Sequence, residues 1–337
     1  MKSSVKRFRC FFLPLLLAGC NSVDNLALYL LEQGLHQGGL ILGARDINKL
    51  LAEPNLDPKT EQYLRLSQKV IEYSKVNFDF TSTSQYQKYV SLNRDWVTQI
   101  VMAAPKDKLE PYLFSYPLMG KLPYKGFFSE AQAIKLQENL KAEGLDTYRR
   151  KVPAYSTLGW LADPVFSTMF SSPEGFVELL FHELCHSQFY FSSQADFNEA
   201  FASWFAYKAS LQFFANQPEA LAKFTGSQDK QVRLAKVVSD ILVQGKKTYA
   251  SDSSSLDSRR QEFFTLIRSR LSSETGLERL ASLEWNNALV LSMSTYYEWV
   301  PRIEAYAEKN KLGAKELLKR VVAEGPSIVD KISANSQ

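Results

Sequence analysis

The residues best suited to chemistry in this sequence are two histidines with a glutamate between them. His182, Glu183 and His186 form an HExxH motif within the stretch FHELCH. Histidines four positions apart on a helix project from one face with their Cβ atoms about 6 Å apart, so both imidazoles can reach one tetrahedral Zn²⁺. Glu183 falls on an adjoining flank, where it can take a proton from a water molecule but is poorly placed as a third ligand. The motif therefore predicts a zinc site with a general base.

The small number of histidines argues against a chance motif. The chain has only three, and two of them fall at metal-binding spacing around a glutamate. Glu183-x-x-His186 is also half of a di-iron carboxylate site, which needs a second Glu-x-x-His pair. The remaining histidine, His36, cannot complete such a pair because Gln33 stands at the glutamate position. The sequence thus favours one Zn²⁺ per chain.

A third ligand is expected from the segment that follows His186. A carboxylate is favoured over the one remaining imidazole, and it would give a His₂Glu donor set. The serine pair at 192–193 is suited to a turn and to the N-cap of a second helix. If the turn is centred there, His186 and Glu199 are about equally far from it on antiparallel helices and face one another. Asp196, one turn earlier, is the alternative ligand; otherwise it can orient a ligand histidine or cap the second helix.

Apolar periodicity places these residues in a mainly helical chain. Apolar residues at spacings of three and four predict a series of helices. They cover residues 26–43, 58–76, 130–143, 173–190, 195–215, 229–245, 256–271, 284–298 and 313–323.

A small sheet is expected in the region of about 95–160, before the metal-binding helices. β-branched and aromatic residues predict strands at 97–102 and 112–114 and an extended stretch at 148–160, with prolines between them. The zinc helices (about 173–215) and a helical C-terminal part (226–325) come later in the chain. The sequence therefore predicts an α+β fold, a mainly helical body with a small β-sheet.

The first 19 residues have the composition of an export signal. A basic stretch precedes an apolar run at 11–18, which is too short to span a bilayer. Leu17-Ala18-Gly19-Cys20 resembles the bacterial lipobox, whose cysteine is acylated after cleavage in front of it. We therefore expect a signal peptide at 1–19, a single mature domain at 20–337, and lipid anchoring in the bacterial cell envelope through Cys20. Asn21 after the cysteine favours the periplasmic face of the outer membrane.

Charge and cysteine content exclude several classes of partner and fold. The formal net charge of +4 comes from residues 1–19, and 36 basic residues balance 36 acidic ones in the rest of the chain. A neutral mature chain offers no electrostatic basis for binding nucleic acid. Cys10 would leave with the signal and Cys20 would be acylated, so Cys185 alone remains and no intramolecular disulfide is expected.

Longer motifs carry a resemblance to known peptidase families. The segment FNEAFA at 197–202, after HELCH, resembles the gluzincin arrangement of thermolysin-like peptidases and zinc aminopeptidases, in which an Asn-Glu pair on the next helix supplies the third ligand. Only 12 residues separate His186 from Glu199, fewer than is usual in those enzymes. The chain is more similar to the bacterial predicted aminopeptidase family of envelope lipoproteins, over nearly its whole mature length. The segments that carry this similarity are YPLMG at 116–120, PYKGFF at 123–128, AYSTLGW at 154–160 with Asp163-Pro164, the metal helices, and Asn286-Asn287 through Thr295-Tyr296 to Trp299-Val300-Pro301.

This resemblance implies a zinc metallopeptidase with a thermolysin-like pair of active-site helices. Its substrate would be a peptide, hydrolysed by water that the metal activates and Glu183 deprotonates. The implied site comprises the ligands His182, His186 and Glu199, the base Glu183, and the neighbouring residues Asp196 and Asn198.

Two tyrosines and one extended segment could complete such a site. Tyr155 and Tyr296 are candidate donors to the tetrahedral oxyanion, although ordinary packing explains most of the 16 tyrosines. Residues 154–159 fall where gluzincins place an edge strand that pairs with the substrate backbone. A plain core strand is an equal alternative for that segment.

Two other functional classes remain open at this point. A non-catalytic envelope lipoprotein could keep zinc as a structural element, although such a site usually has four protein ligands. A zinc amidase or esterase acting on cell-envelope material would use the same residues as a peptidase.

Overall fold

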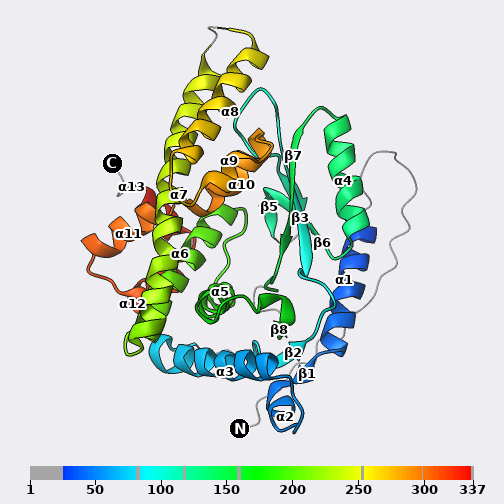
Figure 1. Ribbon diagram of the computed structural model, residues 1–337, viewed down its shortest axis with the longest axis vertical. Helices are drawn as coiled ribbons and strands as arrows, with labels where there is room; N and C mark the ends of the chain where they lie inside the picture. The colour runs from blue at the N-terminus through cyan, green and yellow to red at the C-terminus, as the bar shows by residue number, and fades with distance from the viewer. Residues whose placement is uncertain are drawn as a thin grey trace, which may run out of the picture.

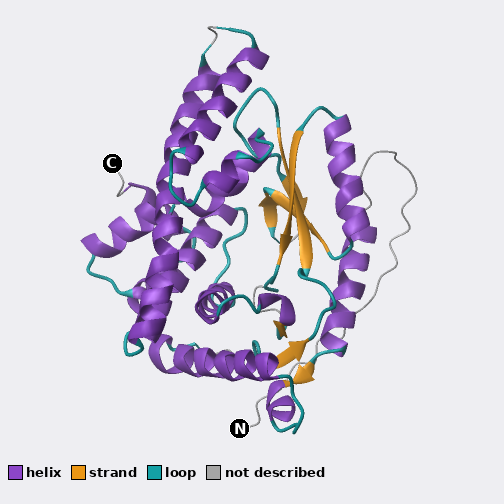
Figure 2. Ribbon diagram, viewed as in Figure 1, coloured by secondary structure: helices purple, strands orange, loops and turns teal. Residues whose placement is uncertain are grey.

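The computed structural model describes residues 26–80, 84–116, 119–157, 161–251, 254–297 and 299–334. The expected signal peptide and Cys20 lie outside these residues. In the described part helices dominate and the strands form small sheets, so the predicted α+β fold is confirmed (Figure 2). Within these ranges, no helix combines the length and the apolar content needed to cross a bilayer.

The described helices largely follow the predicted pattern. In chain order they are α1 (Leu26–Leu42), α2 (Ile47–Leu51), α3 (Pro58–Phe78), α4 (Glu130–Ala142), α5 (Pro173–His186), α6 (Ala195–Phe214), α7 (Pro218–Ala250), α8 (Leu256–Ser272), α9 (Glu278–Ala281), α10 (Asn287–Tyr297), α11 (Val300–Lys309), α12 (Ala314–Glu324) and α13 (Ser327–Ala334).

Several predicted boundaries were wrong. Helix α5 ends at His186 rather than at residue 190, and α7 begins at Pro218 rather than at 229. Proline suits the first position of a helix because its missing N–H would have no partner there. Helices α2, α9, α11 and α13 were not predicted, since helices of 4 to 10 residues offer few apolar repeats.

The main sheet is antiparallel, with β3 (Thr98–Ala104) between β6 (Tyr124–Phe127) and β7 (Asp146–Val152). Helices cover both of its faces, α4 on one side and α10 on the other (Figure 1). Because side chains alternate along a strand, Val101 packs in a cluster with α4, whereas Ala104 packs with residues of α10. Burial on both faces explains why β3 is apolar along most of its length.

Short strands build two further sheets. They are β1 (Arg45–Asp46), β2 (Lys88–Val90) and β8 (Val165–Phe166) in one sheet, and β4 (Phe114–Tyr116) with β5 (Gly120–Leu122) in a hairpin. Strand β2 pairs in parallel with β8, which brings the segment before β2 next to the segment before β8. That second segment contains residues 154–157 and Asp163.

The extended stretch predicted at 148–160 is correct only in its first part. Strand β7 begins earlier, at Asp146, and ends at Val152, where Pro153 follows. Proline has no N–H to continue a ladder of hydrogen bonds. Residues 154–157 are coil, so neither the edge strand nor the core strand expected there is present; residues 158–160 lie outside the described residues.

The largest apolar cluster surrounds α5 and α6. Helix α5 is seen end-on in the middle of Figure 1, above α3. Phe176 and Phe181 of α5 and Phe201 and Phe205 of α6 are fully buried in this cluster. A helix that is apolar on nearly all sides must be enclosed by other elements, so these neighbours fix the orientation of α5 and α6.

Candidate metal centre

Helix α5 carries the HExxH motif at its C-terminal end. Ser172 caps the start of the helix by accepting a hydrogen bond from the Gly175 N–H at 3.1 Å, and Pro173 follows as the first helical residue. The helix stops at His186. Because the unpaired carbonyls at a helix C-terminus favour positive charge, this end of α5 is a suitable place for a cation.

The connection between α5 and α6 is fixed by Asn198. The Phe191 N–H donates to Oδ1 of Asn198 at 3.1 Å, and the Asn198 amide donates back to the Phe191 carbonyl at 2.9 Å. Ser193 completes the turn with a left-handed φ of 62°. Asn198 was expected beside the metal ligands; its hydrogen bonds instead hold the turn that presents its neighbour Glu199.

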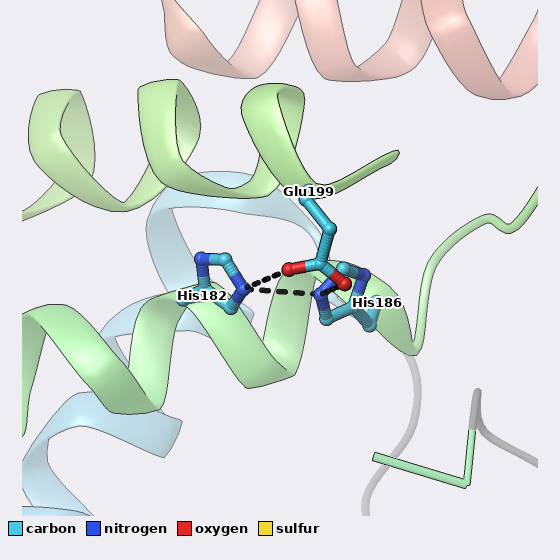
Figure 3. A group of neighbouring side chains, drawn as sticks. All are labelled: His182, His186 and Glu199. Carbon is cyan, nitrogen blue, oxygen red and sulfur yellow. Dashed lines mark hydrogen bonds and ion pairs between the residues drawn. The ribbon is translucent and has the colours of Figure 1, made fainter. Parts of the chain in front are cut away.

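His182, His186 and Glu199 converge between the two helices (Figure 3). The Nε2 atoms of the histidines are 3.1 Å apart, and the carboxylate oxygens of Glu199 lie 3.4 Å from Nε2 of His182 and 3.7 Å from Nε2 of His186. Ligands bound to a tetrahedral zinc at about 2.0–2.1 Å lie about 3.3 Å from one another. The 3.4 Å and 3.7 Å distances end on different oxygens of Glu199, and one ligand atom from each of the three residues lies within 4.8 Å of the others, so the group could hold one metal ion.

The alternative ligand Asp196 is not in this group. It lies in the first turn of α6 and is exposed, whereas Glu199 is largely buried between the helices. Among the residues that the structure describes, no other cluster of three or more His, Cys, Asp or Glu side chains has metal-binding geometry.

The three side chains influence one another's protonation. Burial favours the neutral form of Glu199, but the His186 and His182 imidazoles and Arg150 outweigh it and lower the pKa of Glu199 to about 2. Burial, together with the neighbouring His182, lowers the pKa of His186 to about 4. Burial also acts to lower the pKa of His182, but the adjacent Glu199 carboxylate outweighs it and raises that pKa. An anionic carboxylate and neutral imidazoles are the forms that bind metal, so a cation here would compete with the His182 proton.

Ser203 supports the orientation of His182. Its Oγ lies 3.4 Å from Nδ1 of His182, the ring nitrogen that faces away from the other ligands. Ser203 is one helical turn after Glu199 on α6, so the spacing of four could have identified it in the sequence. Nδ1 of His186 is buried and has no hydrogen-bond partner among the described residues.

Glu183 is buried beside the ligands, with 7% of its surface exposed. Burial raises the pKa of Glu183 to about 7, with the negative charges of Glu199 and Asp163 adding to the rise and His182 opposing it. A carboxylate with a pKa near neutrality is well matched to general-base work. The sequence predicted this role from the motif but could not predict the burial.

Of the two tyrosines predicted as oxyanion donors, the structure describes the side chain of Tyr155 but not that of Tyr296. The Tyr155 ring packs against Phe128 and Phe166, and its hydroxyl is buried without a hydrogen-bond partner in the described residues. Burial, followed by the charge of Asp163, raises the pKa of Tyr155. Tyr296 belongs to α10, but its side chain lies outside the described residues, so its role stays a prediction.

Sequence reasoning missed three groups close to the site. Burial and the charge of Glu199 raise the pKa of Tyr190 to about 12, and the Tyr190 hydroxyl donates to the Met119 carbonyl at 3.2 Å. Arg150 of β7 contributes to the lowered pKa of Glu199. Tyr86 interacts electrostatically with Glu183. No local motif distinguishes these residues, because the tertiary fold alone brings them to the two helices.

Comparisons with known proteins support the family suggested by the motifs. Neither a search of curated proteins nor a search of solved structures gives a match. A family model described as "Putative aminopeptidase" matches residues 28–324, which span the metal centre and most of the 337-residue chain. The chain therefore belongs to this putative aminopeptidase family.

Proposed function

We propose that this protein is a zinc-dependent peptidase that hydrolyses peptide bonds with Glu183 as the general base. The observation that supports it most directly is the set of donor separations, 3.1, 3.4 and 3.7 Å among His182, His186 and Glu199. A buried carboxylate, Glu183, stands next to these ligands on the same helix. Membership of a family named for aminopeptidase activity agrees with this function.

The composition of the site favours catalytic over structural zinc. Two imidazoles and one carboxylate are typical of hydrolytic zinc sites, in which the fourth position is left for water or substrate. A structural zinc usually has four protein ligands, and the described residues supply three. Cys185, the thiol nearest in sequence, is fully buried in the apolar cluster, so burial raises its pKa and opposes the thiolate form.

Each residue of the site has a separate proposed role in hydrolysis. When bound, zinc supplies Lewis acidity, which polarises a carbonyl group and acidifies water. Glu183 takes a proton from the attacking water and returns it to the nitrogen of the departing amine. Ser203 holds the His182 ring in place. Tyr155 and Tyr296 are the proposed donors to the oxyanion, and their separate replacement by Phe would show which of them contributes.

The test is a digest of a peptide library by residues 21–337 in three states: as purified, after zinc removal with a chelator, and after zinc is added back. We expect cleavage that disappears with the metal and returns with it. Including each peptide with a free and with an acetylated N-terminus separates an aminopeptidase, which needs the free amine, from an endopeptidase. Cleavage unaffected by complete zinc removal would overturn the proposal.

A zinc amidase or esterase is the alternative that uses the same residues. Peptidoglycan fragments and simple esters belong in the same assay for this reason. Zinc-dependent turnover of these compounds, with none of any peptide, would assign the site to that alternative.

We also propose that the protein is anchored in the bacterial envelope by a lipid on Cys20, at the periplasmic face of the outer membrane. The lipobox-like sequence supports this, and α1 begins six residues after Cys20 with three exposed leucines, Leu31, Leu35 and Leu42. Cys20→Ser should leave unprocessed or soluble protein where the wild type fractionates with membranes. Equal membrane retention of the variant would contradict the anchor.

A further inference from the structure

Helix α1 is attached to the rest of the molecule through one face. Tyr29, Gln33 and Leu40 share this face, because residues four and eleven positions apart on a helix differ in direction by only about 20–40°. The Tyr29 hydroxyl donates to the Gly126 carbonyl at 2.7 Å, and Oε1 of Gln33 accepts from the Phe128 N–H at 3.2 Å. Leu40 packs against the largest apolar cluster. These contacts define the inner face of α1.

Three leucines lie on the opposite face of α1 and are exposed. Leu31, Leu35 and Leu42 repeat the spacing of the inner residues two positions later, which is about 200° around the helix. Their exposed fractions are 59%, 69% and 89%. A Cβ built on Gly38, which lies between Leu35 and Leu42 in direction, would meet no atom within 4 Å. This outer side, called here the leucine face, is therefore open.

The distribution of side chains on α1 is the reverse of the usual one for a surface helix. Such a helix normally packs apolar side chains inward and exposes polar ones. In α1 the polar groups of Tyr29 and Gln33 bond to the protein, and the Glu32 carboxylate accepts a hydrogen bond from the Gln132 amide. The exposed leucines point outward. An outward apolar face indicates a surface that contacts an apolar partner.

The position of α1 in the chain favours lipid as that partner. Leu26, the first residue of α1, comes six residues after Cys20, and an extended chain covers about 3.3–3.6 Å per residue. A lipid on Cys20 would thus hold the start of α1 within about 20 Å of the bilayer. Glu32 is the one Asp, Glu, Lys or Arg residue of α1, so the leucine face can enter a lipid surface without removing a charge from water. Helix α1 also runs along the edge of the molecule (Figure 1).

We propose that the leucine face of α1 rests in the surface of the bilayer that holds the anchor, and that it fixes the orientation of the protein on the membrane. The leucines enter the boundary between headgroups and acyl chains, as the apolar face of an interfacial helix does. Because α1 has no lysine or arginine for anionic headgroups, apolar burial drives the contact and lipid charge has no effect on it. The proposal rests on the lipid anchor proposed for Cys20.

The test uses residues 21–337 held on phosphatidylcholine vesicles by an N-terminal hexahistidine tag and a nickel-chelating lipid. Leu35→Cys carries an environment-sensitive fluorophore, and Cys185 stays unlabelled because it is fully buried. We expect the emission to shift to shorter wavelength on the vesicles and to lose most of its intensity when the acyl chains carry spin-label quenchers. Replacing part of the phosphatidylcholine by phosphatidylglycerol should leave both effects unchanged.

Val232→Cys is the matched control. Val232 is similarly exposed, at 65%, but belongs to α7, which lies on the other side of the main sheet from α1 (Figure 1). Its label should keep the emission that it has without vesicles. If the two labels responded alike, whether both changed or neither did, the proposal would be overturned.

A second copy of the chain is the other occupant that could cover the leucine face. Sedimentation of residues 21–337 without vesicles tests this, and we expect a monomer. A dimer that dissociates when Leu31, Leu35 and Leu42 are all replaced by serine would overturn the proposal. The anchor fails separately, if Cys20→Ser is retained on membranes like the wild type. The vesicle assay still decides the role of the leucine face, because its tether does not use Cys20.

Discussion

Two buried polar clusters in this protein differ in how many of their polar atoms have hydrogen-bond partners among the described residues. In the first, called here the Asp146 network, Arg260 donates to both carboxylate oxygens of Asp146 at 3.0 and 2.9 Å. The Asn287 N–H adds a third bond to this carboxylate at 2.9 Å. The Asn287 side chain donates to the Pro105 carbonyl at 2.8 Å and accepts from the Tyr249 hydroxyl at 2.6 Å. The network joins β7, α7, α8 and α10.

The second cluster, called here the Glu183 cluster, consists of Glu183, Asp163, Tyr86 and Tyr155. The hydroxyls of both tyrosines and Oδ1 of Asp163 are buried without hydrogen-bond partners in the described residues. Burial raises the pKa of Asp163 to about 6 and that of Glu183 to about 7. Buried polar groups that are fully paired stabilise a fold, whereas groups left open at some cost mark a site reserved for chemistry. If the proposed function is correct, the Asp146 network serves the stability of the fold and the Glu183 cluster serves the chemistry.

The largest expected effect is the loss of metal when a ligand is removed. His186→Ala and Glu199→Ala should each abolish the zinc that elemental analysis finds at about one ion per wild-type chain. Asp196→Ala should weaken zinc binding about tenfold at most. Full zinc occupancy in Glu199→Ala would show that another residue supplies the third ligand, and Asp196 would be the first candidate.

The next largest effect is expected from breaking the Asp146 network. Asp146→Ala leaves Arg260 largely buried without its carboxylate, and loss of one partner of such a pair costs about 3–5 kcal/mol in the free energy of unfolding. Urea unfolding measures this change, and zinc content should stay at one per chain.

Glu219→Ala is the control for this measurement. It removes the exposed ion pair with Lys223 and should change the free energy of unfolding far less than Asp146→Ala does, because water screens exposed charges. If Asp146→Ala and Glu219→Ala lowered the free energy of unfolding by the same small amount, the Asp146 network would have no special structural role.

A pH-dependent effect of intermediate size is expected from Asp163. Its pKa is about 6 in the folded protein and 3.8 as a free side chain, so its folded state prefers the neutral acid. The wild type therefore loses stability as pH rises from about 4 to about 6, by an amount on the order of 3 kcal/mol. Between pH 4 and pH 7 in chelator, Asp163→Asn should lose less stability than the wild type by about this amount, because the loss caused by the raised pKa of Glu183 remains in both proteins. If the free energy of unfolding changed equally with pH in the two proteins, the Asp163 carboxyl would have no such effect on stability.

The smallest effect is expected from Ser203. Ser203→Ala removes the hydroxyl next to Nδ1 of His182 and should weaken zinc binding by about tenfold through loss of ring orientation. Competition with a calibrated chelator measures it. Unchanged affinity would mean that the α6 backbone and packing alone orient the His182 ring.

Local patterns in the sequence were sufficient for the metal centre. The HExxH spacing, the serine turn and the distance to Glu199 together predicted two antiparallel helices with three converging side chains. These inferences needed only helix geometry, because all three residues lie within one helix–turn–helix unit. The choice of Glu199 over Asp196 followed from the position of the turn, and the structure brings Glu199 to the histidines.

The Glu183 cluster could not be predicted because it depends on tertiary contacts between distant segments. Asp163 and Tyr86 are brought together where β2 pairs in parallel with β8, strands of three and two residues that show no periodicity. The left-handed backbone of Tyr86 has no signal in its residue type. Residues 154–157 were predicted as a strand, but the chain after Pro153 instead forms the coil that donates hydrogen bonds to Asp163.

The central claim is that Glu183 performs chemistry at the metal centre without binding the metal. The most direct measurement is turnover of a cleaved peptide by zinc-loaded wild type and zinc-loaded Glu183→Gln, with zinc content determined on the same samples. Gln keeps the size of the side chain but cannot accept a proton, so we predict equal zinc content and a rate lower by about 10² to 10⁴. Cleavage by Glu183→Gln at the wild-type rate would contradict the account.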